Sequence, residues 1–370
     1  MTSKKQTLIK RKSAQPESSP QLLEDLRRMI EETRHGVAVT VNAALSLLYW
    51  RVGERINREI LKGERAEYGK EILATLSQEL VRDYGNGFGE KNLRRMIQFA
   101  EVFPDEQIVV SLIRELSWTH FIALIPLDKP LQRDFYAEMC RLERWSVRTL
   151  RQKIGSMLYE RTALSKKPEK LARIELDALR EEDKLTPDLV FRDPYFLDFL
   201  GLKGAFQEKD LETAIIREME AFILELGIGF TFVARQKRIT VDEDDFYLDL
   251  LFYHRDLCRL VAIELKLDKF RPEHKGQMEL YLRWLDKHER REGEGAPLGM
   301  ILCAGKKQEQ IELLELDRSG IHVAEYLTDS LPKDVIQEKL HKAIALARKR
   351  LENRSEEGNA ENEVKLLEGE

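Results

Sequence analysis

The 370-residue chain has very little cysteine. Its three cysteines, Cys140, Cys258 and Cys303, are scattered, and no two of them form a Cys-x-x-Cys pair. Disulfide frameworks and cysteine zinc sites both depend on several cysteines at short, regular spacings. The sequence therefore supports neither of them, and we expect the three thiols to be reduced packing residues.

Long apolar runs are also missing. No run approaches the roughly 20 residues that are needed to span a bilayer. The N-terminal stretch MTSKKQTLIKRKSAQPESSP lacks the apolar segment of a secretory signal. These absences predict a cytoplasmic protein without a membrane partner. Hydrophobic residues still make up 42% of the chain, which is enough for two domains that each bury a core.

Charge is distributed unevenly along the chain, although its net value is only -5. Residues 1–170 contain 30 Lys and Arg against 23 Asp and Glu, whereas residues 171–370 contain 31 against 43. A basic half suits a polyanion partner, and a solvated helical surface explains the same excess equally well. The acidic half would repel nucleic acid unless cations intervene.

Composition and periodicity divide the chain into five parts. Apolar residues at three- and four-residue spacing predict a helical domain, which we expect to be all-α. The segment after it is charged and is expected to be a linker, and the C-terminal domain mixes helices with strands. The parts are a disordered basic arm (1–20), the helical domain (21–160), the linker (161–204), the mixed domain (205–354) and a disordered acidic tail (355–370).

The mixed domain has the predicted order helix, three strands, helix, two strands, helix. The strands are rich in β-branched and aromatic residues, and the first helix ends at a glycine. The expected ranges are 211–227 for the first helix, 229–241, 246–254 and 259–266 for the strands, 273–291 for the second helix, 297–305 and 321–327 for the last strands, and 331–354 for the closing helix.

Two of these strands carry charges that an apolar strand normally lacks. The sequence FYLDLLFYHRDLCRLVAIELK contains Asp249 within the first strand, and Glu264 and Lys266 at the end of the second. Buried charges without partners cost several kcal/mol. If a tight turn closes around residues 256–257, antiparallel partners have numbers that sum to 513. Asp249 then lies opposite Glu264, where like charges repel.

The residues alone leave two interpretations of this pair. Asp249, Glu264 and Lys266 are consistent with a structural cluster of ion pairs. They are equally consistent with a hard divalent cation that is held by carboxylate oxygens and a backbone carbonyl, with the lysine beside it. A cation would neutralise the carboxylates and would let an acidic domain hold a phosphate.

The arrangement resembles the PD-(D/E)xK nuclease superfamily, in which Asp lies on the second strand and Glu-x-Lys on the third. The matching residues are Asp249, Glu264 and Lys266, with Leu265 as the variable position. The long run from FILELGIGF to YLRWLD is similar to the YhcG-like family of bacterial nucleases. So are GNGFGEKNLRRMIQFAEVFP, LSWTHF and WSVRTLRQKI. Gly89 departs from the serine expected there, which puts the start of the following helix in doubt.

The resemblance implies an α/β nuclease-like C-terminal domain with an αβββαβ core and a magnesium-dependent, endonuclease-like hydrolase. Asp249 and Glu264 would ligate Mg²⁺ or Mn²⁺ together with the Leu265 carbonyl. Lys266 would orient the attacking water or stabilise charge on the phosphate in the transition state.

Three flanking residues are further candidates for the site. Glu212 lies on the sheet-facing side of the first helix and reaches the metal through water, or else forms a surface salt bridge. Gln277 resembles a superfamily position that contacts the substrate or an active-site water, with solvent exposure as the alternative. Gln236, in the first strand, is a candidate for contact with nucleic acid.

The helical domain contains one candidate DNA-binding element. Lys91, Arg94 and Arg95 lie near the start of a helix after a tight turn, as in the recognition helix of a helix-turn-helix, although a solvated basic face has the same pattern. DNA is the expected partner, and a homodimer is plausible for an enzyme that cuts both strands. The alternatives are an RNA nuclease and a binding or recruiting protein that keeps the nuclease fold only as a scaffold.

Overall fold

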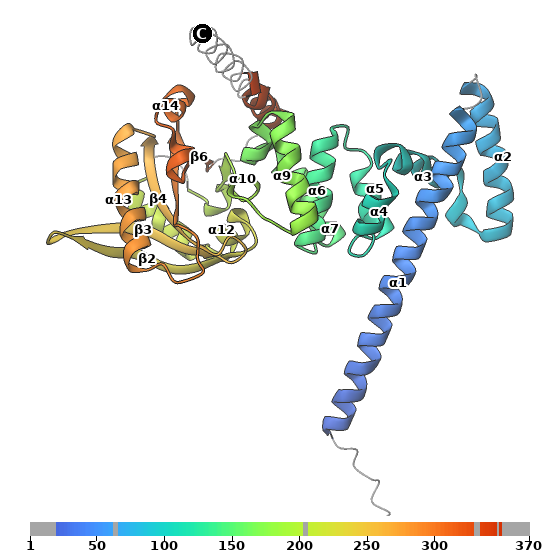
Figure 1. Ribbon diagram of the computed structural model, residues 1–370, viewed down its shortest axis with the longest axis horizontal. Coiled ribbons are helices and arrows are strands. Elements are labelled where there is room, and N and C mark those ends of the chain that lie inside the picture. Colours follow the sequence, from blue (N-terminus) through green and yellow to red (C-terminus); the bar gives the residue numbers. More distant parts are fainter. Residues whose placement is uncertain (1–19, 62–65, 203–205, 329–333, 346–347, 350–370) are drawn as a thin grey trace, which may run out of the picture. The chain divides into compact units, whose positions relative to one another are not determined.

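The computed structural model describes residues 20–61, 66–202, 206–328, 334–345 and 348–349. Residues 1–19 of the expected basic arm and the whole of the expected acidic tail lie outside this part of the chain. The chain divides into two compact units, residues 1–121 and residues 122–370 (Figure 1).

The described part of the first unit is helical, which confirms the all-α expectation. The long helix α1 packs on α3 through Gly53, where an added Cβ would lie 1.8 Å from the Met96 carbonyl oxygen. Leu93 and Met96 are fully buried beneath this crossing. The elements are α1 (Pro20–Leu61), α2 (Ala66–Tyr84), η1 (Asn86–Phe88), α3 (Glu90–Val102), α4 (Glu106–Leu112) and α5 (Trp118–Leu124), which ends three residues into the second unit.

The second unit begins with short helices. These are α6 (Pro130–Leu142), α7 (Val147–Gly155), α8 (Leu158–Arg161), η2 (Ala163–Lys166), α9 (Glu169–Glu182) and α10 (Pro187–Val190). The segment 161–204 was expected to be a linker, but its described part, residues 161–202, is folded. It also contributes β1 (Tyr195–Phe196) and η3 (Asp198–Leu200), and β1 pairs with the last strand of the sheet.

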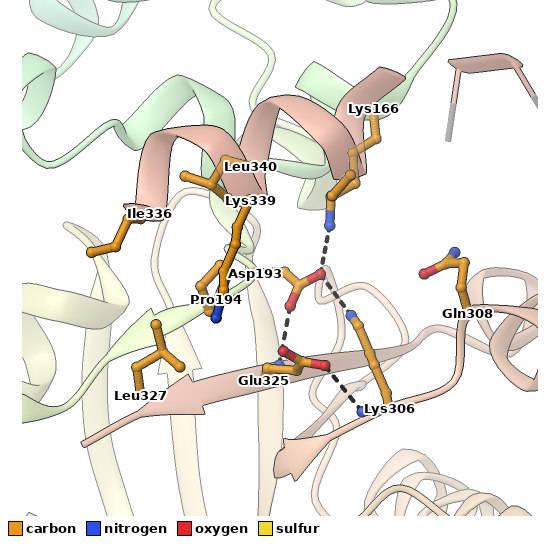
Figure 2. Close-up of a pocket in the computed structure, with 11 residues that line it drawn as sticks. Lys166, Asp193, Pro194, Lys306, Gln308, Glu325, Leu327, Ile336, Lys339 and Leu340 are labelled. Atoms are coloured by element: carbon orange, nitrogen blue, oxygen red, sulfur yellow. Dashed lines mark hydrogen bonds and ion pairs between the residues drawn. The ribbon is translucent and has the colours of Figure 1, made fainter. Parts of the chain in front are cut away.

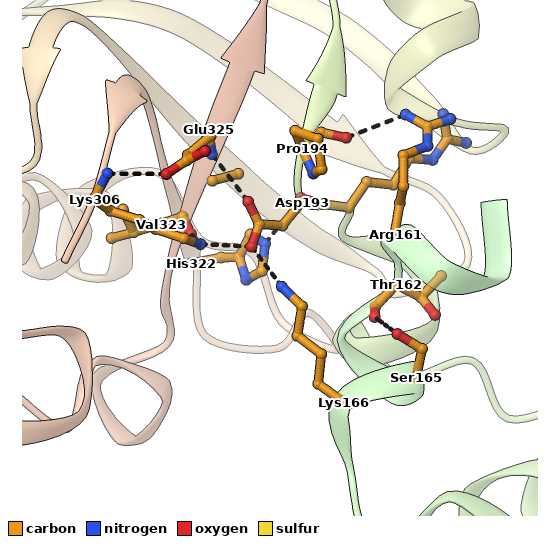
Figure 3. Close-up of polar contacts among 12 residues, drawn as sticks. Arg161, Thr162, Ser165, Lys166, Asp193, Pro194, Lys306, His322, Val323 and Glu325 are labelled. Atoms are coloured by element: carbon orange, nitrogen blue, oxygen red, sulfur yellow. Dashed lines mark hydrogen bonds and ion pairs between the residues drawn. The ribbon is translucent and has the colours of Figure 1, made fainter. Parts of the chain in front are cut away.

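Buried ion pairs explain why this segment folds. Arg161, whose side chain is 1% exposed, forms an ion pair with Glu225. Asp193 forms ion pairs with Lys166 and Lys306 (Figure 3). The partners of Asp193 lie 27 and 113 residues away along the chain. Such partners leave no local periodicity, so composition alone makes the segment look like a linker.

A six-stranded sheet forms the centre of the second unit, in the order β1-β6-β5-β4-β3-β2. The hairpin strands β2, β3 and β4 are antiparallel, whereas β4, β5, β6 and β1 are parallel. The remaining bounds are α11 (Glu208–Arg217), α12 (Met219–Leu226), β2 (Phe230–Val241), β3 (Asp244–His254), β4 (Arg259–Lys269), α13 (Pro272–His288), β5 (Leu298–Gly305), α14 (Gln308–Leu313), η4 (Leu316–Ser319) and β6 (Ile321–Leu327).

The two faces of the sheet carry separate apolar cores. Residues of α11 and α12 pack on one face, and residues of α13 pack on the other. Residues 334–345 are also helical. This arrangement confirms the expected αβββαβ core, with the first expected helix divided into α11 and α12 at Glu218. None of the helices within the described ranges is long and apolar enough to cross a membrane.

Candidate active site

The candidate site lies where β3 and β4 part. Their ladder runs from the pair His254 and Arg259 to the pair Leu250 and Ile263, in the register expected from the turn. Beyond that point, side-chain carboxylates accept hydrogen bonds from the backbone N–H groups of the facing strand. Asp249 Oδ2 accepts from the Leu265 backbone N–H at 2.8 Å.

Glu264, on β4, accepts a hydrogen bond from the backbone of β3 in return. Its Oε1 atom accepts from the Asp249 backbone N–H at 3.4 Å, and its Oε2 atom accepts from Lys266 Nζ at 3.0 Å. Glu264 is 3% exposed, and the Lys266 side chain is 17% exposed. The structure thus brings together the three residues of the sequence motif, with Glu264 at the bottom and Lys266 nearer to solvent.

Burial makes this pair of carboxylates difficult to ionise together. Loss of solvation, followed by repulsion from Asp249, raises the pKa of Glu264 to about 7. Loss of solvation also raises the pKa of Asp249. Burial alone would lower the pKa of Lys266, but the attraction and hydrogen bond to Glu264, together with attraction to Glu208 and Asp249, outweigh it, and the net shift is upward. Lys266 is therefore a cation beside both carboxylates, and its attraction lowers both of their pKa values without cancelling the effect of burial.

Gln236 and Glu212 extend the site toward α11. Gln236, on β2, donates its side-chain N–H groups to Glu212 Oε2 at 2.9 Å and to Asp249 Oδ1 at 3.1 Å. Its backbone has a φ of 46°, an uncommon value for a residue other than glycine. One amide therefore connects the two carboxylates, and Gln236 contacts a motif residue rather than only lining a cleft.

Gln277 does not contact the carboxylates directly. Its Nε2 atom donates to the Tyr281 hydroxyl at 2.7 Å, and that hydroxyl donates to the Tyr247 carbonyl at 3.4 Å. Burial, with a smaller contribution from Glu264, raises the pKa of Tyr281. The sequence reasoning did not include Tyr281, yet it lies one helical turn after Gln277 and so shares its face of α13.

Glu208 is a second residue that the sequence reasoning missed. It lies in the first turn of α11, and its Oε1 atom accepts from the Leu267 backbone N–H at 3.4 Å. Its charge also contributes to the raised pKa of Lys266. The spacing Glu208 to Glu212 is one helical turn, a signal that could have identified both residues together.

The donors fit a hard divalent cation only in part. Within the described residues, no group of three or more His, Cys, Asp and Glu side chains is arranged to hold a metal ion. Asp249 and Glu264 provide two carboxylates with raised pKa values, which an added cation would lower. Magnesium is commonly held by one or two carboxylates, water and substrate phosphates. The pair therefore suits Mg²⁺ or Mn²⁺ better than a metal that needs four protein ligands.

The candidate DNA-binding residues lie on α3 in the first unit. Lys91 and Arg94 are exposed and Arg95 is half-buried. Arg94 forms an ion pair with Glu90 at 2.5 Å, one turn earlier. The helix begins after Gly89, which caps it without a side-chain hydrogen bond. A helix therefore starts at this point without the serine that the resemblance led us to expect.

Comparisons with known proteins agree with this geometry. Residues 25–161 match the profile of the DUF1016 N-terminal domain, and residues 188–341 match the profile of the YhcG PDDEXK nuclease domain. The Escherichia coli (strain K12) protein named "Putative nuclease YhcG" is 33% identical over 316 residues, which cover 77% of this chain and 84% of that protein. The chain belongs to the YhcG family. Its C-terminal part is a nuclease domain of the PDDEXK type.

Solved structures show weaker likenesses to this YhcG-family chain. A repair endonuclease from Pyrococcus abyssi is 20% identical, with a TM-score of 0.24, over 35% of this chain and 50% of that one. A complex of EndoMS with double-stranded DNA is 19% identical, with a TM-score of 0.26, over 35% of this chain and 49% of that one. The chain spans about half the length of these two structures.

Proposed function

We propose that the protein is a metal-dependent nuclease that hydrolyses phosphodiester bonds in DNA. The observation that carries this proposal is the meeting of Asp249, Glu264 and Lys266 at the point where β3 and β4 part. A structural cluster of ion pairs would not need two adjacent carboxylates whose pKa values are both raised. A site that binds a cation would need two such carboxylates as ligands.

The residues of the chain have distinct roles in this proposal. Asp249 and Glu264 would hold Mg²⁺ or Mn²⁺ with the Leu265 carbonyl, which points to the same side of β4 as the Leu265 N–H that Asp249 accepts. The bound cation supplies Lewis-acid polarisation of the scissile phosphate. Lys266 stabilises the developing negative charge and orients the attacking water. Gln236 fixes the Asp249 carboxylate by a hydrogen bond and donates another to Glu212, which would reach the same cation through water.

The helix α13 would supply the substrate side of the site. Gln277 and Tyr281 form a hydrogen-bonded pair beside the carboxylates, and an amide and a phenol suit a backbone phosphate or an ordered water. In the first unit, Lys91, Arg94 and Arg95 on α3 would bind DNA phosphates. We therefore propose a helical binding domain, near residues 21–160, attached to the nuclease domain.

The experiment that tests the proposal is cleavage of matched DNA and RNA substrates, linear, branched and single-stranded, with Mg²⁺ or Mn²⁺. Wild type is compared with Asp249→Asn, Glu264→Gln and Lys266→Ala. We expect each substitution to abolish cutting or to lower its rate by a factor of about 100 or more, because each removes charge at the reacting phosphate.

Two matched substitutions control for changes in fold and surface charge. Asp245→Asn alters an exposed carboxylate on β3, and Lys269→Ala alters an exposed lysine on β4. Both should leave cutting unchanged. Cleavage of RNA but not of DNA would show that the protein is an RNA nuclease with the same site. Failure of the wild type to cut any substrate, with binding intact in all variants, would leave a binding protein on a nuclease scaffold.

A further inference from the structure

A cavity lies at the carboxyl ends of β5 and β6. Its volume is about 300 Å³, and its other sides are Pro194, just before β1, and the helix at residues 334–345 (Figure 2). The strands β1, β4, β5 and β6 are parallel. Ligands of open sheets with parallel strands bind outside the carboxyl ends of those strands. The cavity therefore lies at the edge of the sheet where small ligands usually bind.

Asp193 fixes two lysines at this cavity. Its Oδ2 atom accepts from Lys166 Nζ at 2.5 Å and from Lys306 Nζ at 2.6 Å, while its Oδ1 atom accepts from the Glu325 backbone N–H at 3.1 Å (Figures 2 and 3). Burial alone would raise the pKa of Asp193, but the two lysines outweigh it and hold the pKa well below its usual range. Asp193 is thus an ionised anchor with both oxygens occupied.

The charges that line the cavity do not balance. Lys166, Lys306 and Lys339 face two carboxylates, Asp193 and Glu325. The Glu325 carboxylate already accepts from the Lys306 backbone N–H at 3.1 Å. Lys339 extends from the helix toward Pro194, and no hydrogen bond or ion pair is recorded for it within the described part of the chain (Figure 2). One positive charge is left over, which favours an anionic ligand.

The rest of the lining is apolar. Leu327, Ile336, Leu340 and Ala343 supply this apolar wall, and the last three lie on the same helix as Lys339. An inorganic anion would leave this wall uncovered, whereas the ring of a nucleotide would cover it. Lysine binds phosphate as a point charge. We propose that the cavity binds a nucleotide, with its phosphate on Lys306 and Lys339 and its base against the apolar wall.

The nucleotide has two sources with the same chemistry, a free mononucleotide and a nucleotide of a nucleic-acid strand. The register aligns Lys266 with Cys303 on β5 and Cys303 with Glu325 on β6. Two strand spacings, roughly 10 Å, thus separate the proposed cleavage site from the cavity. A nucleic-acid strand that is held at one site can reach the other. The proposal that this strand is the source of the nucleotide rests on the proposed nuclease function, whereas binding of a free nucleotide does not.

Titration calorimetry on the full chain in EDTA tests the proposal. The probes are inorganic phosphate, deoxyadenosine 5′-monophosphate, a short single-stranded oligonucleotide and a duplex. Lys339→Glu and Lys339→Met are compared with wild type, and Lys342→Glu is the control. Lys342 lies on the same helix, pairs with Glu338 and does not line the cavity. Both altered lysines are exposed, so the fold should be kept.

We expect the mononucleotide to bind more tightly than phosphate. Both substitutions of Lys339 should weaken its binding about tenfold or more, the usual size of one lost charged contact, and Lys342→Glu should not. If only the oligonucleotides bind, and binding depends on Lys339, the strand is the source. No binding of any probe, or equal losses at Lys339 and Lys342, would overturn the proposal. Glu264→Gln should stop cleavage without altering this binding, which separates the two proposals.

Discussion

Glu264 is buried next to a second carboxylate, and this has a consequence for stability. Its pKa in the folded chain is about 7, against an ordinary value of 4.5. Because the raised pKa means that the folded state holds a proton more tightly, the contribution of Glu264 is complete below about pH 4.5 and is lost as the pH rises through about 7. In the absence of metal, the free energy of unfolding should fall by on the order of 3 kcal/mol over this range.

We therefore predict that Glu264→Gln is more stable than wild type at pH 8 in EDTA, although it should not cut. Glutamine keeps the size of the side chain and carries no charge. Urea unfolding at pH 5 and pH 8 measures the difference. An identical pH dependence in wild type and variant would show that Glu264 ionises normally.

Gln236 offers a second prediction at the same scale. Its amide connects Asp249 with Glu212, so its loss should release the Asp249 carboxylate without removing a ligand. Gln236→Leu should raise the Mg²⁺ concentration for half-maximal cutting by about 10-fold, as is usual for a residue that orients a metal ligand. Thr231→Ala, an exposed change on the same strand, is the control. A rate that drops equally at all Mg²⁺ concentrations would indicate another role for Gln236.

At the scale of elements, Asp193 joins β1 to the loop after β5 and to η2. Its low pKa gives stability that is present above about pH 4 and is lost as the pH falls below the ordinary value of 3.8. Asp193→Asn leaves Lys166 and Lys306 without their carboxylate, and it should cost about 3–5 kcal/mol in the free energy of unfolding at pH 7.

Chemical denaturation at pH 7 and pH 3 checks this prediction. The variant should lose less stability than wild type between the two pH values, since the titrating carboxylate is gone. Asp188→Asn is the matched control, because Asp188 pairs with Lys167 and is 37% exposed. A loss as large at Asp188 as at Asp193 would argue against the buried anchor.

The helix α3 carries the prediction for the first unit. Replacing Lys91 and Arg94 with alanine should weaken DNA binding in EDTA and should lower the slope of log affinity against log salt by about 2, one for each lost phosphate contact. Arg82→Ala, on the neighbouring α2 and paired with Asp83, is the control. An unchanged slope would mean that the basic face of α3 is only a solvated surface.

Local patterns predicted the elements and the motif, but not the contacts between distant segments. The length of the turn fixes the register of β3 and β4, so Asp249 and Glu264 could be brought together from the sequence alone. Gln277 was assigned to the substrate because it resembles a superfamily position, but its hydrogen bond to Tyr281 depends on how α13 packs on the sheet. Asp193 pairs with Lys306, which lies 113 residues away, and sequence periodicity does not predict contacts at that separation.

At the scale of the whole molecule, the family profiles and the structure divide the chain differently. The nuclease profile starts at residue 188, whereas the compact second unit starts at residue 122. Arg161 and Lys166 lie between these points and hold Glu225 and Asp193. We predict that a fragment of residues 122–349 folds, and that a fragment of residues 188–349 is less stable by on the order of 3–5 kcal/mol.

Thermal and urea unfolding of the two fragments provides the measurement. The shorter fragment leaves buried charges with fewer partners, and it also loses the hydrogen bond from the Asp193 N–H to the Arg161 carbonyl. Equal stabilities would show that the helices before residue 188 do not stabilise the nuclease domain. The comparison therefore decides where the nuclease domain begins.

The two edges of the sheet restrict how copies of the chain could join. One edge is β1, which is only two residues long, and the other is β2. The pairing of β2 shifts register between Phe232 and Ala234, and its exposed residues include Arg235 and Arg238. Short strands, irregular pairing and charged side chains all oppose growth of a sheet by edge-to-edge pairing. Any assembly of this protein that cuts both strands of a duplex would therefore have to be built through helices or loops, with each sheet remaining closed to its neighbour.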